Sequence, residues 1–76
     1  MNFDEEGFRE YLFNQRYSRG TVINYIARAR AAFQVGATEP DQVVSRCPEK
    51  SAETRHAMRK SLRRYAEYLE GTEVRS

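Results

Sequence analysis

The stretch between Ser18 and Gly36 limits the fold more than any other part of the sequence. Its apolar residues recur three or four positions apart, which is the spacing of one face of an α-helix. They are Val22, Tyr25, Ile26, Ala29, Ala32 and Phe33. Ser18 suits a helix N-cap and Gly36 suits the position after a helix, so we predict a helix over residues 18–35. Such a helix must bury its apolar face against other elements.

Three further segments carry helix signals, and the sequence contains no strand-like alternation. We predict helices over residues 4–15, 39–46 and 51–70, with Gly71 ending the last one before an aperiodic tail. The N-terminal signals are Asn2 or Asp4, then Thr38 with Pro40, then Ser51. The apolar residues are Phe8, Tyr11 and Leu12, then Val43 and Val44, then Met58, Leu62, Tyr65, Ala66 and Leu69. The sequence therefore predicts an all-α fold with short connections.

The size of the chain limits what such a fold can do. With 76 residues, of which 39% are hydrophobic, it can build only one core, and we expect a single domain over residues 1–76. A domain of this size buries roughly 60% of its unfolded surface, which leaves little apolar area for a deep active-site cleft. These limits argue against an autonomous enzyme.

The cysteine and histidine content excludes further classes of protein. Cys47 is the only cysteine and His56 the only histidine, so neither an intramolecular disulfide nor a Cys/His metal cluster can form. The acidic first residues do not resemble a secretory signal, and no apolar run approaches the roughly 18 residues that a membrane span needs. We expect a cytoplasmic protein that has no metal, cofactor or membrane anchor, with Cys47 as a buried or half-exposed spacer.

Charge is distributed unevenly along the chain. The net charge is −3 over residues 1–15, +4 over residues 16–36 and +2 over residues 51–70. Eleven of the thirteen basic residues are arginine, whose planar fork matches phosphate groups and guanine edges. Two basic stretches of this kind predict a polyanion as partner.

The last predicted helix has a core face and a cationic face. Arg55, Arg59 and Arg63 follow each other at four-residue spacing and therefore repel, at a cost of a few tenths of a kcal/mol per pair. Lys60 and Arg64 lie beside them on the same half of the helix. A solvated helix face is the alternative interpretation, but like charges in register favour phosphate binding.

Taken together, the segments resemble the N-terminal core-binding domain of tyrosine recombinases, the phage-integrase family. The motifs that carry the resemblance are Phe8-x-x-Tyr11-Leu12, Tyr17-Ser18-x-x-Thr21-Val22-x-x-Tyr25 leading to Phe33, the short connecting helix at Asp41-Gln42-Val43-Val44, and Arg64-Tyr65-x-x-Tyr68-Leu69. They cover nearly the whole chain. No motif is diagnostic alone, and the specificity lies in their order and spacing.

The resemblance implies a compact four-helix orthogonal bundle of SAM-like type that clamps one face of duplex DNA, while a separate catalytic domain clamps the other. It assigns the DNA contacts to the second and fourth helices. The residues at these positions are Arg19, Thr21, Asn24, Arg28, Arg55, Arg59, Lys60, Arg63 and Arg64. It also implies protomer contacts through the first helix, for which Phe13 is a candidate. The family's catalytic residues lie in a larger C-terminal domain that these 76 residues do not include, so we expect a non-catalytic domain.

Three other interpretations compete with this one. His56-Ala57-Met58-Arg59 has the spacing of the family's catalytic His/Arg pair, and Tyr65 and Tyr68 follow it. A nucleophilic tyrosine needs several converging cations, however, and these two tyrosines lie on the same predicted helix as the pair. A helix-turn-helix regulator would need a small residue or glycine between the first two helices. A helical protein-interaction module would use the basic face to dock an acidic protein, and the absence of salt-dependent DNA binding would favour it.

Overall fold

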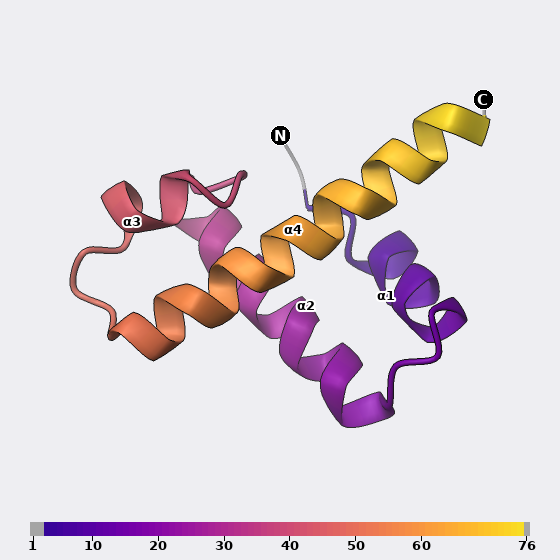
Figure 1. The fold of residues 1–76 in the computed structure, drawn as a ribbon, viewed down its shortest axis with the longest axis horizontal. Helices are drawn as coiled ribbons and strands as arrows, with labels where there is room; N and C mark the ends of the chain where they lie inside the picture. The colour runs from indigo at the N-terminus through magenta and orange to yellow at the C-terminus, as the bar shows by residue number, and fades with distance from the viewer. Residues whose placement is uncertain (1–2, 76) are drawn as a thin grey trace.

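The computed structural model describes the backbone of residues 3–75 and the side chains of residues 3–71. Within this part of the chain all regular structure is helical, in the order α1 (Glu5–Asn14), α2 (Arg19–Gln34), α3 (Gln42–Arg46) and α4 (Ala52–Arg75). Figure 1 shows α4 crossing α2, with α1 and α3 on opposite sides of the crossing. The predicted all-α class with four helices is confirmed.

Polar side chains before three of the helices determine where these helices begin. Asp4 Oδ1 accepts a hydrogen bond from the Gly7 amide at 3.2 Å, and Ser18 Oγ accepts one from the Thr21 amide at 3.3 Å. Ser51 Oγ accepts one from the Thr54 amide at 3.2 Å. These bonds satisfy first-turn donors that have no partner within the helix. The predicted caps at Asp4, Ser18 and Ser51 are confirmed, and the alternative cap Asn2 lies outside the described residues.

Two predicted helix boundaries were wrong. α3 begins at Gln42 rather than at residue 39, because Gln42 Oε1 accepts the amide hydrogens of Thr38 and Glu39 at 2.8 and 3.2 Å and holds these residues in a turn. α4 continues through Gly71 to Arg75. A glycine ends a helix when it takes up the left-handed conformation, which Gly36 does at φ 84° and Gly71 does not.

Arg16 occupies the left-handed position that follows α1, with φ 67°. Its amide donates to Phe13 O at 3.0 Å and the Tyr17 amide donates to Leu12 O at 3.4 Å, which closes α1 as Gly36 and Ala37 close α2. Only glycine adopts this conformation without steric cost. A non-glycine residue at this position therefore stores strain.

We expect Arg16→Gly to stabilise the protein. Relief of the left-handed strain should stabilise the folded protein by about 1–2 kcal/mol. Glycine also gives the unfolded chain more conformational freedom, which offsets about 0.4–1 kcal/mol of that gain. A net gain of about 1 kcal/mol should raise Tm by about 4–8 °C in thermal unfolding followed by circular dichroism. Arg16→Ala removes the same charge but keeps the strain, so an equal rise in that variant would contradict the explanation.

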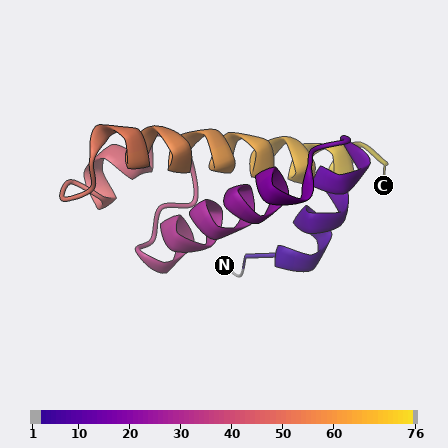
Figure 2. The same cartoon turned by 90° about the horizontal axis from the view of Figure 1, so that it is seen from below.

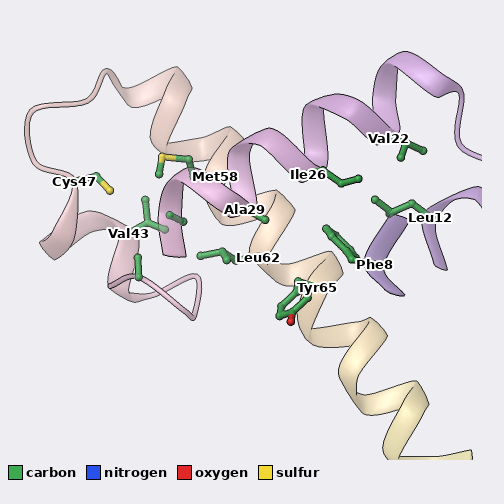
Figure 3. Close-up of a cluster of buried hydrophobic side chains, with 12 residues drawn as sticks. Phe8, Leu12, Val22, Ile26, Ala29, Val43, Cys47, Met58, Leu62 and Tyr65 are labelled. Carbon is green, nitrogen blue, oxygen red and sulfur yellow. The ribbon is translucent and has the colours of Figure 1, made fainter. Parts of the chain in front are cut away.

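The core lies between α4 and the other helices. Figure 2 shows α4 along one side of the molecule, with α2 and α1 beneath it. Figure 3 shows the labelled buried side chains converging from all four helices. The buried apolar residues are Phe8, Leu12, Val22, Ile26, Ala29, Ala32, Ala37, Val43, Cys47, Met58, Leu62 and Tyr65. Most of the predicted apolar positions are therefore in the core.

Three apolar residues of the predicted helices are exposed, and two of them, Ala66 and Leu69, were predicted on the core face of the last helix. Val44 is 55% exposed, because α3 is a five-residue helix that buries one side only, the side of Val43. Leu69, in the C-terminal half of α4, is 38% exposed, and Ala66 on the same helix is also exposed. Phe3 was not predicted to pack, yet its ring lies 5.0 Å from that of Tyr65 and 5.2 Å from that of Phe33.

Candidate nucleic-acid interface

α2 carries four of the predicted DNA contacts, namely Arg19, Thr21, Asn24 and Arg28. Because Val22 and Ile26 are buried, these residues lie on the parts of the helix that face away from the core. Thr21 is half-buried and its Oγ1 accepts a hydrogen bond from Ser18 Oγ at 3.0 Å, so its hydroxyl belongs to the helix cap. The other three side chains are exposed and form no ion pair or side-chain hydrogen bond with the described residues.

α4 carries the other five predicted contacts, and two of these have partners within the protein. Arg55 Nη1 donates to the carbonyl oxygen of Pro48 at 3.2 Å. Arg64 Nη1 donates to both carboxylate oxygens of Glu67 at 3.0 Å, and this pairing is the main reason that the pKa of Arg64 is raised. The remaining three, Arg59, Lys60 and Arg63, have no ion pair in residues 3–71.

Two adjoining depressions of the surface contain most of these side chains. The α4 hollow, of about 230 Å³, is lined by His56, Arg59, Lys60, Arg63 and Arg64. The α2–α4 groove, of about 320 Å³, is lined by Thr21, Asn24, Tyr25, Arg28, Ala57, Lys60 and Ser61. Lys60 lines both, so cations from two helices meet on one continuous surface.

Two of the arginines that line the α4 hollow have a donor that no described residue pairs. The Nε atoms of Arg59 and Arg64 are buried and have no hydrogen-bond partner among the described residues. An unpaired buried donor costs about 1–3 kcal/mol, and more when the group is charged. No carboxylate is among the described residues that line the hollow, and of its cations only Arg64 has an ion pair with a described residue.

Two arginines outside these depressions are neutralised by one acidic residue of the protein. Glu5 on α1 pairs with Arg9 one turn later at 2.7 Å and with Arg30 on α2. The hydrogen bond from Arg30 is the main reason that the pKa of Glu5 is lowered, and Arg9 contributes in the same direction. The positive charge of Arg30 is therefore neutralised within the bundle, whereas Arg28 has no ion pair with a described residue.

The structure brings seven of the nine predicted residues into the groove and the hollow, and one of these seven, Arg64, is paired with Glu67. The seven are Thr21, Asn24, Arg28, Arg59, Lys60, Arg63 and Arg64. Arg19 and Arg55 line neither depression. Ala57 and Ser61 were missed, and Tyr25 was assigned to the core alone; the only signal was their place at the border between the apolar and basic stripes of their helices.

The residues of the His-x-x-Arg motif and the tyrosines after it do not share a site. His56 and Arg59 line the α4 hollow. Tyr65 is 3% exposed and its hydroxyl accepts the Asp4 amide hydrogen at 2.9 Å, whereas the Tyr68 hydroxyl donates to Asp4 Oδ2 at 2.5 Å. Both tyrosines therefore hold the start of α1 against α4.

Comparisons of the whole chain with protein-family models, with curated proteins and with solved structures find no match. Among the described residues, no three Cys, His, Asp or Glu side chains are grouped so that they could hold a metal ion. None of the helices in that part of the chain combines the length and the apolar character needed to cross a membrane.

Proposed function

We propose that this protein binds double-stranded DNA through α2 and α4, as the non-catalytic core-binding half of a site-specific tyrosine recombinase or integrase. The observation that carries the proposal is that the α2–α4 groove and the α4 hollow adjoin at Lys60. Arg28, Arg59 and Arg63 bring further positive charge to this surface without an acidic partner among the described residues. The phosphate backbone of DNA is a partner of complementary charge.

The chemistry of the cations favours phosphate over a protein carboxylate. Among the described residues, Glu5 pairs with Arg9 and Arg30, and Glu67 pairs with Arg64, whereas no carboxylate pairs with Arg28, Arg59, Lys60 or Arg63. Arginine forks bind phosphate oxygens in pairs, and a duplex offers such oxygens in a regular row. A surface built from two crossing helices can follow that row.

The family resemblance supplies the other parts of the proposal. The bundle would be of the SAM-like orthogonal type, and a catalytic domain in the same recombinase would cleave and rejoin the DNA while this domain holds it. α1 would contact a neighbouring protomer, for which Phe13 is available because its side chain is 46% exposed. We place the protein in the cytoplasm, where a free buried cysteine such as Cys47 is ordinary.

Two other functions are less well supported. A protein-interaction module is favoured by the exposed side chain of Ile23 on α2, which is 58% accessible. One observation favours a helix-turn-helix regulator. Arg16 lies in the turn between the first two helices and adopts the left-handed conformation that a glycine would take there. Such a regulator would read DNA with α2 alone, however, and the unpaired cations lie on both α2 and α4.

The test is fluorescence anisotropy of the 76-residue chain with a labelled mixed-sequence duplex over a salt series. We expect the logarithm of the association constant to fall linearly with the logarithm of the salt concentration, by about 0.9 for each phosphate contacted. Poly-glutamate at equal charge concentration is the matched competitor. No binding at low salt, or equal competition by poly-glutamate, would remove the DNA proposal and favour the protein-interaction module.

A further inference from the structure

The two depressions that meet at Lys60 differ in the chemistry of their walls. Four of the five residues that line the α4 hollow carry a positive charge, and the fifth is His56. The α2–α4 groove adds neutral polar groups from both helices to the cations Arg28 and Lys60. Cationic walls suit phosphate, whereas neutral groups that both donate and accept hydrogen bonds suit base edges.

Within the groove, the carboxamide of Asn24 is the neutral group that is free to bind. The Thr21 hydroxyl is engaged with Ser18, and Ser61 Oγ is buried. The Tyr25 hydroxyl interacts with Arg64 and helps to raise the pKa of that arginine, and Ala57 has no polar side-chain atom. Asn24 is exposed and its carboxamide forms no hydrogen bond with any described residue.

Folding does not require an asparagine at this position. Asn24 lies in the middle of α2, where asparagine is a poorer helix former than alanine by up to about 0.7 kcal/mol. It caps no helix and packs in no core, as its exposure shows. The residue is therefore better explained by a partner than by the fold.

We propose, on the basis of the proposed DNA binding, that the two depressions divide the recognition of DNA between them, with Asn24 selecting an adenine and the α4 hollow seating a backbone phosphate. The Asn24 carboxamide donates to N7 and accepts from the N6 amino group of adenine in the major groove. Arg28 lies one turn further along α2 and Lys60 lies across the groove, so positive charge flanks the position of the base. These cations hold the phosphates on either side and fix the register in which Asn24 meets the base.

The experiment starts from a pool of duplexes with random sequence, because the recognised site is not known. Duplexes retained by the wild-type chain are sequenced, and anisotropy then gives the affinity of each variant for a selected duplex and for a scrambled one over a salt series. The variants are Asn24→Ala, Lys60→Ala and the control Asn14→Ala, which removes another exposed asparagine, at the end of α1. Thermal unfolding of each variant checks that it is folded.

We expect the wild-type pool to be enriched in adenine at one position. Asn24→Ala should lose that enrichment and bind the selected duplex about 5- to 150-fold more weakly, with its affinity for the scrambled duplex and its salt slope unchanged. Lys60→Ala should weaken both duplexes equally and reduce the salt slope by about 1, and Asn14→Ala should change nothing.

Four results would overturn this inference. A wild-type pool without a base preference would leave DNA binding intact and remove the assignment of a reading residue. If Asn24→Ala weakens binding to selected and scrambled duplexes alike, or keeps the adenine enrichment, DNA binding again stands and Asn24 is not the residue that reads the base. If the wild-type chain retains no duplex at low salt, the proposed function fails first and the inference fails with it.

Discussion

Replacing Phe8 with alanine should lower the free energy of unfolding by about 3–5 kcal/mol, the usual cost of removing a buried aromatic side chain. Phe8 is fully buried, and its ring lies 5.1 Å from that of Tyr65 and 6.0 Å from that of Phe3. A 76-residue domain is typically stable by roughly 4–11 kcal/mol, so the variant loses a large part of its stability. Thermal unfolding should show Tm at least about 12 °C lower.

The matched control is Phe13→Ala, which makes the same substitution five positions later on α1, where the ring is 46% exposed. We expect a change of about 0.5 kcal/mol or less, as for most surface positions. If the two variants lose similar stability, Phe8 does not anchor α1 to α4 as the structure has it. A soluble, folded Phe13→Ala protein also serves to test the proposed protomer contact.

The double variant Arg59→Ala/Arg63→Ala should bind duplex DNA about 60-fold more weakly at 0.1 M salt. With a slope of about 0.9 per phosphate contact, each contact strengthens binding by a factor of about 8 when the salt concentration falls from about 1 M to 0.1 M. The variant removes two such contacts, and their factors multiply. The slope itself should become shallower by about 2. Neither arginine has an ion pair in residues 3–71, so we expect little change in stability.

Net charge alone must be separated from the position of the charge. Arg9→Ala/Arg30→Ala lowers the net charge from +2 to zero, as the first double variant does, but removes cations that Glu5 already neutralises. We expect this control to keep most of its DNA affinity and nearly all of its salt slope. Equal losses in the two variants would mean that α4 does not face the phosphates.

Helix order and most N-termini could be predicted because the signals are local. A serine or aspartate cap and the apolar spacing act within one or two turns, and Asp4, Ser18 and Ser51 each cap the helix that follows. The ends were harder, because they depend on geometry that sequence does not display. Gly36 and Gly71 are the same residue type, yet one adopts a left-handed φ and ends a helix while the other lies inside one.

The candidate interface was predictable as a set of residues but not as a shape. The periodicity of α2 and α4 separates their basic stripes from their apolar ones, and that placed Asn24, Arg28 and Lys60 outside the core. That these three line one groove depends on how the helices cross, which involves residues more than thirty positions apart. The Glu5–Arg30 pair escaped prediction for the same reason, whereas Arg64–Glu67, three positions apart on one helix, had a local signal.

Asp4 joins the two ends of the described chain. Its amide donates to Tyr65 and its carboxylate accepts from Tyr68, over separations of 61 and 64 residues, while its other oxygen caps α1. Bringing such distant segments together costs more loop-closure entropy than any contact between neighbouring helices. We therefore expect the attachment of α1 to α4 to form late in folding, after α2 and α4 have crossed and provide a surface that α1 can pack against.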